Sequence, residues 1–284
     1  MVSRGDGWRN VERAPNPHGT AYEPPAVGRV GVSAVIITSN EERHLGPCLD
    51  SLRWVDEIVV VDAGSADRTA DLAKRAGARV FVRDPTGRGS QKHFGLEQAL
   101  GDWFLVIDAD ERVSDALADE IRTRQAAGTL ATHAAYDVPR RNYFFGRWLR
   151  WGGTYPDRQV RLIRRGKGRY NDLPLHEHLL VEGEVGHLSG HLVHDAARTI
   201  GDRIAKLDRY SDYAAVETLK KRRRATWWDL VIRPTVIFGK LYVLKQGFRD
   251  GLAGLVYCGL ASLYEFMRYV KLWERASEAA TSGR

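Results

Sequence analysis

The chain has 284 residues, of which 43% are hydrophobic and 28% charged. That length suits one large domain, or one domain with an appendage, and the ordinary composition excludes collagen-like and wholly disordered proteins. Two cysteines, Cys48 and Cys258, are too few for a disulfide framework and match no cysteine-based metal pattern, which favours a reducing compartment.

The net charge of +7 is not spread evenly along the chain. Residues 218–249 hold nine lysines and arginines against one acid, Asp229, so this segment carries +8 and the rest of the chain −1. A basic segment of this kind indicates a local contact with an anionic surface. The near-neutral remainder, without an RNA-binding signature, argues against a nucleic-acid partner.

We expect neither an export signal nor a membrane-spanning segment at the two ends of the chain. Residues 1–29 are rich in Gly, Pro, Arg and Asn and lack the apolar core of a signal peptide, so we expect a disordered lead-in. Near the C-terminus the longest uncharged stretch, 251–264, is well short of the ~20 apolar residues of a spanning helix.

From residue 32 the sequence alternates between short β-branched runs and helical spacing of apolar residues. Strands are predicted at 32–38, 58–61, 78–82 and 103–107, and helices over about 45–55, 70–76 and 90–100. Such alternation predicts an α/β fold with a mostly parallel sheet flanked by helices. Thr38, Asp62 and Asp108 lie at the ends of these strands, so we expect them to share the sheet edge where such folds bind ligands.

After about residue 130 this alternation weakens. An Arg- and aromatic-rich section spans 138–170, with one strand expected at 159–163. From Thr199 the apolar spacing is helical again and leads through the basic segment into an aromatic-rich stretch. The predicted organisation is a lead-in at 1–29, a main domain at 30–196, and a helical, basic and aromatic, membrane-peripheral region at 197–284.

The most informative motif is Asp108-Ala109-Asp110, which follows an apolar strand. Two carboxylates one residue apart can bind Mg²⁺ or Mn²⁺, ions that also bind phosphate oxygens. A solvated turn would explain a bare Asp-x-Asp equally well. The apolar strand before it, and Asp62 at the end of another such strand, favour the metal site.

A second motif, at 61–69, joins a buried strand to a helix through Gly64 and Ser65. Its carboxylate, Asp62, can accept hydrogen bonds from a nucleobase or from ribose hydroxyls. Alternatively, Asp62 and Ser65 only cap the next helix. The chain has no GxGxxG or Walker sequence, which disfavours dinucleotide oxidoreductases and P-loop NTPases.

Four motifs in order, at 38–42, 61–65, 89–93 and 108–111, resemble those of the inverting family 2 glycosyltransferases, which have a GT-A fold. The likeness continues into the segments 152–153, 155–162 and 175–177 and into the aromatic, basic tail. Within the family, the chain looks most like the bacterial branch that includes lipopolysaccharide-core glucosyltransferases. The resemblance makes the main domain a GT-A catalytic domain and its Arg- and aromatic-rich section the acceptor side.

The resemblance also implies which residues bind the donor. Thr38 and Asp62 would contact the base and ribose of a nucleotide sugar such as a UDP-sugar, and Lys92 would approach its diphosphate. The donor-binding set that it implies is Thr38, Asn40, Glu41, Asp62, Gly64, Lys92 and Asp108.

By the same resemblance, Asp108 and Asp110 would serve the ribose and the metal ion. His194 is a further candidate ligand of that ion. His194 also belongs to a group of five histidines, at 176, 178, 187, 191 and 194, that suggests a rival transition-metal site of a metallohydrolase. There is no HExxH sequence, and glycines at 186 and 190 argue against a helix that would align these rings. We therefore expect ordinary surface and core histidines on strands.

An inverting transfer, as the resemblance implies, needs a general base, because the acceptor hydroxyl must lose a proton as it attacks the anomeric carbon. Glu177, between His176 and His178, is our first candidate, since the family's matching segment lies where the acceptor site closes. Asp157 is the second candidate and Asp172 the third. A carboxylate beside two histidines is also a common structural ion pair.

Aromatic and basic residues alternate in two places. Arg147, Trp148 and Trp151 are expected to stack on sugar rings and pair with phosphates, although packed aromatics at a solvated edge would look alike. Trp227 and Trp228 open a tail whose mixture of aromatic and basic residues suits helices lying in a membrane interface on anionic headgroups. Packing against the catalytic domain is the alternative there.

The resemblance and these features together predict metal-dependent transfer of a hexose, for example glucose from UDP-glucose, onto a saccharide or lipid-linked acceptor of an envelope glycolipid such as the lipopolysaccharide core. The enzyme is expected in the cytoplasm, peripheral on the inner face of the cytoplasmic membrane. Three alternatives stay open: a sugar-nucleotide nucleotidyltransferase, a metallohydrolase using the 176–194 histidines, and a non-catalytic membrane-binding module. The first normally has a Gly-rich basic loop after its first strand, where this chain has Asn40-Glu41-Glu42.

Overall fold

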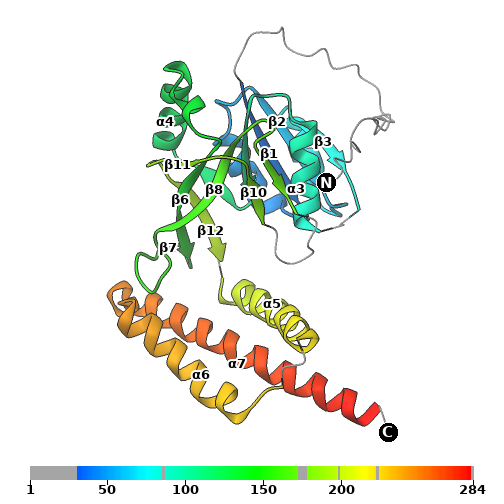
Figure 1. Cartoon of the computed structure of the whole chain (residues 1–284), viewed down its shortest axis with the longest axis vertical. Helices are drawn as coiled ribbons and strands as arrows, with labels where there is room; N and C mark the ends of the chain where they lie inside the picture. The colour runs from blue at the N-terminus through cyan, green and yellow to red at the C-terminus, as the bar shows by residue number, and fades with distance from the viewer. Residues whose placement is uncertain (1–30, 85–86, 172–177, 198, 222–223, 283–284) are drawn as a thin grey trace, which may run out of the picture.

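The computed structural model describes residues 31–84, 87–171, 178–197, 199–221 and 224–282, with side chains as far as residue 278. The predicted lead-in at 1–29 lies outside these ranges. Figure 1 shows an α/β part built on one large sheet and, below it, three long helices. These helices are α5 (Ile200–Lys220), α6 (Trp227–Gly239) and α7 (Gly251–Ser282).

One half of the large sheet is parallel. Its strands are β1 (Val32–Thr38), β2 (Glu57–Asp62), β3 (Arg79–Val82) and β4 (Trp103–Asp108), in the spatial order β3-β2-β1-β4. All four predicted strands are confirmed, each within one residue at either end. Short β-branched runs are buried on both faces of a parallel sheet, which is why this part of the pattern is readable from sequence.

The other half of the sheet continues from β4 in the order β8-β6-β12-β5. These strands are β8 (Asp157–Arg164), β6 (Ala135–Phe144), β12 (Leu192–Ala197) and β5 (Glu111–Val113). Two short strands, β7 (Arg147–Trp148) and β11 (Val185–His187), also pair with β6, and β9 (Gly168–Tyr170) pairs with β10 (Leu179–Val181) in a separate small sheet. The α/β class predicted from the sequence is confirmed.

Helices cover both faces of the sheet. They are α1 (Glu42–Asp50), α2 (Thr69–Arg75), α3 (Arg88–Gln98) and α4 (Asp115–Ala126), with a 3-10 turn η1 (Thr129–Thr132). Side chains alternate across a strand, so Ile36 of β1 packs in the cluster that contains Leu45 of α1, whereas Val35 packs in the one that contains Leu96 of α3. A Cβ at Gly95 would lie 2.4 Å from Val35 Cγ1, so glycine allows α3 to lie this close to the sheet.

Two sequence expectations need correction. Helix α1 ends at Asp50, earlier than predicted, because Leu52 and Val55 pack on the core from a turn. The section after residue 130 contains the long strand β6 as well as the expected β8. Three consecutive polar residues, 140–142, interrupt the apolar pattern of β6, and their partners are far away in sequence.

The C-terminal helices begin with sequence-encoded caps. Thr199 and Asp202 form a capping box at α5, and Thr226 and Asp229 form another at α6. Between α6 and α7 the chain passes through a π-helical turn, η2 (Lys240–Leu244), and a 3-10 turn, η3 (Gly247–Asp250). None of the helices in the described ranges combines the length and hydropathy that a membrane crossing requires.

Candidate active site

The carboxyl ends of three neighbouring strands form one polar rim. In the register of the sheet Thr38 lies opposite Asp62 of β2, and Ile37 lies opposite Asp108 of β4. The expectation that Thr38, Asp62 and Asp108 share an edge is therefore confirmed, while their individual roles stay predictions. Parallel strands bring their ends to one side, where the loops that follow them surround a ligand site.

Asp62 is 1% exposed and accepts hydrogen bonds on both carboxylate oxygens. Thr38 Oγ1 donates to Oδ1 at 2.8 Å, and the backbone N–H of Ser65 donates to Oδ2 at 2.8 Å. Asn40 ties this turn to the loop after β1, since its N–H donates to Ser65 Oγ at 2.8 Å and its Oδ1 accepts from the N–H of Ala66 at 2.9 Å. The two loops that would surround a nucleoside are thus fixed to each other.

Glu41 and Gly64 belong to the same pair of loops. The N–H of Glu41 donates to Thr69 Oγ1 at 2.8 Å, at the start of α2, and its carboxylate lies 2.8 Å from His44 Nδ1. Gly64 has φ +74°, a left-handed conformation that glycine adopts without strain. These contacts shape the loops, and they leave the donor contacts expected of both residues as predictions.

Asp108 lies between two buried cations. Lys92 Nζ of α3 is 3.1 Å from Oδ1, and Arg161 Nη2 of β8 donates to Oδ2 at 2.8 Å. Burial opposes ionisation, but the charges of Arg161 and Lys92 outweigh it and hold the pKa of Asp108 well below its ordinary value. Asp108 is therefore a fixed carboxylate at neutral pH.

Asp110 faces a histidine and a lysine from later in the chain. His194 Nε2 of β12 lies 3.4 Å from Oδ2, and Lys206 Nζ of α5 lies 3.7 Å from the same oxygen. Burial opposes ionisation here too, but the hydrogen bond and charge of His194 outweigh it and lower the pKa of Asp110. The predicted association of Asp110 with His194 is thus present as a contact.

Asn142 fixes the orientation of the His194 ring. Its Oδ1 lies 2.6 Å from His194 Nδ1, and its Nδ2 donates to Thr154 O and to Asp157 Oδ2, both at 3.0 Å. Both of those partners are acceptors, so the amide nitrogen must face them and the amide oxygen must face the imidazole. The Nδ1–H of His194 therefore donates to Asn142, and Nε2 is directed toward Asp110.

A buried ionic chain under the rim was missed by the sequence analysis. Glu111 is fully buried, and its Oε1 accepts from Arg161 Nη2 at 2.6 Å and from Arg140 Nη1 at 2.9 Å. Its Oε2 accepts from the N–H of Asp108 at 3.0 Å. Arg140 continues to Asp157 Oδ2, 2.6 Å from Nη2. This ionic chain runs from Asp108 to Asp157. In the sequence it was signalled only by charged residues inside strands.

Asp157, the second candidate base, is occupied by these neighbours. Oδ2 accepts from Arg140 and Asn142, and Oδ1 accepts from Gln159 Nε2 at 2.8 Å. Burial raises the pKa of Asp157, but the hydrogen bonds and charge of these neighbours outweigh it and leave the pKa lowered. A carboxylate held in this way is a poor proton acceptor. Glu177 and Asp172, the first and third candidates, lie outside the described residues.

The histidines do not gather. His187 Nδ1 lies 2.9 Å from Asp137 Oδ2, His191 Nε2 lies 3.0 Å from the Tyr155 hydroxyl, and His194 lies at the rim. His176 falls outside the described ranges. Within those ranges no group of three or more His, Cys, Asp or Glu side chains is placed to hold a metal ion.

The predicted acceptor and membrane residues fall into two places. Trp148 lies between the guanidinium groups of Arg141 and Arg150, 4.6 and 4.2 Å from its ring centroid, and Trp151 lies 3.8 Å from Arg249. Arg147, in β7 beside Trp148, is exposed. Trp227 and Trp228, by contrast, are exposed at the start of α6.

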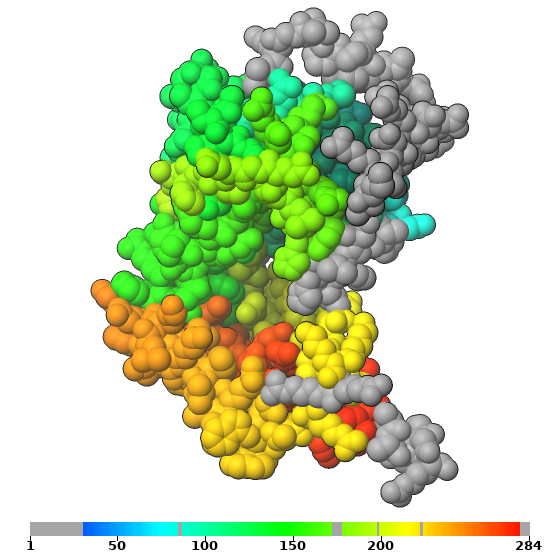
Figure 2. All heavy atoms as spheres, viewed as in Figure 1, coloured from blue at the N-terminus to red at the C-terminus, as the bar shows by residue number. Residues whose placement is uncertain are grey.

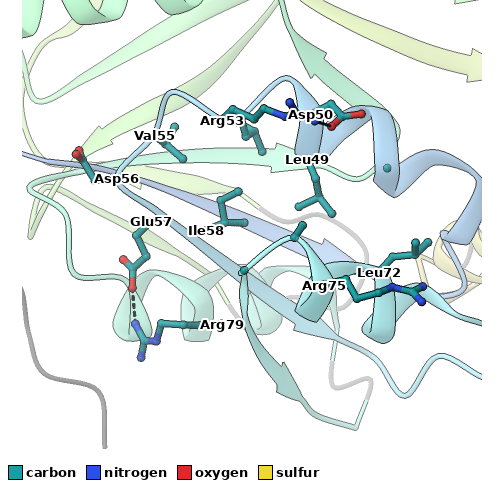
Figure 3. Close-up of a pocket in the computed structure, with 14 residues that line it drawn as sticks. Leu49, Asp50, Arg53, Val55, Asp56, Glu57, Ile58, Leu72, Arg75 and Arg79 are labelled. Carbon is teal, nitrogen blue, oxygen red and sulfur yellow. Dashed lines mark hydrogen bonds and ion pairs between the residues drawn. The ribbon is translucent and has the colours of Figure 1, made fainter. Parts of the chain in front are cut away.

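A hollow of about 690 Å³ lies at the opposite edge of the sheet (Figure 3). It is lined by the first residues of β2 and β3, including Glu57, Ile58 and Arg79, and by side chains of α1 and α2. Because these are the amino ends of parallel strands, the hollow lies away from Asp62 and Asp108. None of the predicted donor residues lines it.

The fold and this rim define a class: an α/β enzyme of the GT-A kind, with fixed carboxylates at the carboxyl edge of its parallel strands. The family described as "Glycosyl transferase family 2" matches residues 33–176. The chain belongs to this family. The match begins one residue into β1 and extends past β9, so it covers Thr38, Asp62, Asp108 and Asp110 of the rim but ends before His194.

Two relatives are similar over most of their length. "Lipopolysaccharide core biosynthesis glycosyltransferase LpsC" of Rhizobium meliloti is 35% identical over 256 residues, 88% of this chain and 94% of that protein. "Uncharacterized glycosyltransferase RT0209" of Rickettsia typhi is 26% identical over 253 residues, 86% of this chain and 87% of its own. Both matches extend into the C-terminal helices, because alignments over 88% and 86% of a 284-residue chain must continue beyond the start of α5.

Among solved structures, residues 1–349 of S. aureus TarS in complex with UDP align with a TM-score of 0.44 at 14% identity, over 89% of this chain and 92% of that one. Glucosyl-3-phosphoglycerate synthase from Mycobacterium tuberculosis, in complex with Mn²⁺, UDP-glucose and phosphoglyceric acid, is 28% identical over 39% of this chain and 44% of that chain, with a TM-score of 0.31. These scores are too low for a residue-by-residue comparison of the sites.

Proposed function

We propose that this protein is a metal-dependent, inverting hexosyltransferase that transfers glucose from UDP-glucose to a saccharide or lipid-linked acceptor in the synthesis of the lipopolysaccharide core or a similar envelope glycolipid. The 35% identity to LpsC supports the acceptor class. The observation that carries the chemistry is Asp110 and His194 at the rim, beside the cation-held Asp108. Family membership supports glycosyl transfer.

The ligand set at the rim fits Mg²⁺ or Mn²⁺. Asp110 Oδ2 and His194 Nε2 lie 3.4 Å apart, and the other ring nitrogen of His194 faces Asn142, an arrangement common for metal-binding imidazoles. Two protein ligands leave room for the oxygens of a nucleoside diphosphate, which suits ions that keep several oxygen ligands. When bound, such an ion neutralises the charge of the departing diphosphate.

The other charges at the rim have separate tasks. Lys92 and Arg161 hold Asp108 in one position, so that its carboxylate meets the donor without rearrangement. Thr38, Asn40 and the Asp62 turn form the nucleoside side of the site. Lys206, which also donates to Ala196 O at 3.1 Å, lies 3.7 Å from Asp110 Oδ2, so its positive charge would be near a diphosphate bound at this rim.

In the transfer, the acceptor oxygen forms its bond to the anomeric carbon as the bond from that carbon to the diphosphate oxygen breaks. The acceptor proton goes to a carboxylate. Glu177 remains our first choice for this base. The hydrogen bonds of Asp157 to Arg140, Asn142 and Gln159 argue for a structural task at that position.

The acceptor class suggests the location. A lipid-linked acceptor lies at a membrane, and the +8 charge of residues 218–249 favours its anionic face. We place the enzyme in the cytoplasm, peripheral on the inner face of the cytoplasmic membrane. No observation on the described residues favours the nucleotidyltransferase or a non-catalytic module over this function.

The direct test is a thermal-shift panel of UDP-, GDP- and TDP-sugars with and without Mn²⁺, followed by analysis of the product anomer. UDP-glucose with Mn²⁺ should raise Tm most. Asp110→Ala should lower turnover by about 100-fold or more, because one protein ligand of the ion is lost. Asp119→Ala, at an exposed position on α4, is the matched control. Undiminished turnover by the Asp110 variant would exclude the metal role.

A further inference from the structure

Helix α7 carries an exposed apolar stripe along most of its length. The stripe consists of Leu252, Leu255, Leu263, Phe266 and Trp273. With 3.6 residues per turn, these positions fall within an arc of about 80°. Leu252 is 75% exposed and Trp273 58%, while Leu255, Leu263 and Phe266 are 38–42% exposed, so the ends of the stripe lie in solvent and its middle is partly covered. Contiguous apolar surface of this kind marks an interaction site.

The stripe faces away from the catalytic sheet and from α5, while α6 packs on α7 beside it, with Ser262 Oγ donating to Pro234 O at 2.8 Å. Tyr257 packs on Phe144 of β6, with ring centroids 4.8 Å apart. Farther along α7, Lys271 Nζ lies 2.7 Å from Asp208 Oδ1, and Arg275 is paired with α5 as well. These inward contacts lie about 150° around the helix from the centre of the stripe. The catalytic sheet and α5 are therefore on one side of α7 and the stripe is on the other.

The turn before α7 extends the same exposed surface. Val243, Leu244 and Phe248 of η2 and η3 are exposed, Leu244 at 77%. Three exposed cations, Lys240, Lys245 and Arg249, lie among them. In Figure 2 the orange surface that includes this turn lies at the left of the helical part, directly below the green surface of β6 and β7. Apolar side chains interleaved with cations suit an interface between acyl chains and anionic headgroups.

The turn is held firmly in place. A Cβ at Gly254 would lie 2.0 Å from Gly247 O, so only glycine permits α7 to lie this close to η3. The backbone N–H groups of Arg150 and Trp151 donate to the Asp250 carboxylate of η3, at 3.1 and 2.8 Å for the nearer oxygens. The exposed turn is therefore connected directly to the segment that leads into β8 and the acceptor side of the site.

From this geometry we propose that the η2–η3 turn and the stripe of α7 form a docking face for an anionic lipid bilayer, and that this face holds the acceptor side of the catalytic domain at the membrane. The inference rests on the proposed function for the meaning of "acceptor side". Charge favours a membrane over a second copy of the chain, because pairing this face with itself would bring together Lys240, Lys245 and Arg249 of both copies. The absence of a crossing helix within the described ranges agrees with a chain that lies on the surface.

The test is flotation of the full-length protein with vesicles of phosphatidylcholine, with and without about 30% phosphatidylglycerol. The triple variant Leu244→Ser/Phe248→Ser/Leu252→Ser should reduce the floated fraction at least tenfold. The matched control, Val82→Ser/Leu180→Ser/Ile200→Ser, replaces three exposed apolar side chains elsewhere and should float like wild type. Equal flotation of the two triple variants would overturn the proposal.

Two further measurements separate the possible explanations. Lys240→Glu/Lys245→Glu should abolish the preference for anionic vesicles, whereas Lys74→Glu/Lys167→Glu, also at exposed positions, should keep it. If wild type forms a dimer and does not bind vesicles, and if the Leu244 triple variant is a monomer, the proposal is overturned. The partner of this face would then be a second copy of the chain. Flotation of wild type without any response to nucleotide sugars would leave the docking face standing and refute the proposed function.

Discussion

The rim of the sheet and the outer face of α7 differ in which side chains they bury and which they expose. At the rim, charged groups are buried and each has a partner within the chain, as Asp108 has in Lys92 and Arg161. On α7, apolar groups such as Leu252 are exposed and the nearby cations are in solvent. The rim is therefore organised before any ligand arrives, whereas the outer face of α7 would be covered only by a partner such as the proposed bilayer.

The largest expected effect is at the buried end of this comparison. Glu111→Ala should lower the free energy of unfolding by about 3–5 kcal/mol, because it leaves Arg140 and Arg161 without their shared buried carboxylate. Urea denaturation measures the change. Glu182→Ala, at an exposed position, is the control and should stay within about 0.5 kcal/mol of wild type. A similar loss in both variants would mean that the rim is not organised by this ionic chain.

The pH dependence of stability sharpens the same point. The folded-state pKa values of Asp108 and Asp110 are lowered, so their contribution is present at pH values above the unfolded pKa, near 3.8, and is lost as pH falls through the folded values. These two groups should therefore change the free energy of unfolding little between pH 6 and 8, which is about two units or more above that pKa. Below this interval the free energy of unfolding should fall as the pH is lowered. Asp108→Asn should show a shallower acid loss in pH-dependent denaturation, and an unchanged slope would contradict the pairing.

Lys206 connects the rim to the C-terminal helices, since it lies on α5 and approaches Asp110. Lys206→Ala should raise KM for the donor about tenfold, equivalent to about 1.4 kcal/mol, with Tm nearly unchanged. Lys206→Arg should recover part of the loss because it keeps the positive charge. Arg209→Ala, exposed on the same helix, should behave like wild type in steady-state kinetics. If Lys206→Ala instead lowered Tm substantially, Lys206 would have a structural role only.

The smallest effect tests how the helical region is supported. Thr226→Ala removes the cap of α6, in which Thr226 Oγ1 accepts from the N–H of Asp229, and should cost about 1 kcal/mol in unfolding free energy. Thr226→Ser should restore most of it. Donor turnover with a soluble acceptor should not change, because the cap does not contact the rim. Thermal unfolding and steady-state kinetics together check both parts.

Local patterns made about half of this architecture predictable. The strands β1 to β4 and helix α5 follow from β-branched runs, helical spacing and caps within a few residues of one another. Strand β6 escaped because Arg140 and Asn142 look like surface residues until Glu111 and Asp157 are brought beside them. Lys206 escaped for the same reason, since only the folded chain places it near Asp110.

The C-terminal region shows the same limit at a larger scale. The mixture of Trp, Lys and Arg predicted helices that lie in a membrane interface. The helices are present, and their contact with a membrane stays a prediction. Composition does not reveal which side of a helix faces outward, however. Which side of α7 faces outward follows from the contacts of Tyr257 and Lys271, and these depend on β6 and α5.

The orientation of the Asn142 amide affects how a proton and a divalent cation would compete beside Asp110. Its oxygen takes the Nδ1–H of His194, so a neutral ring directs a bare nitrogen lone pair at the carboxylate of Asp110 across 3.4 Å. Two electron-rich atoms at that separation repel unless a positive centre lies between them. Either a hydrogen ion or a divalent cation meets that requirement, so uptake of one should displace the other, and occupancy by the divalent cation should weaken in acid.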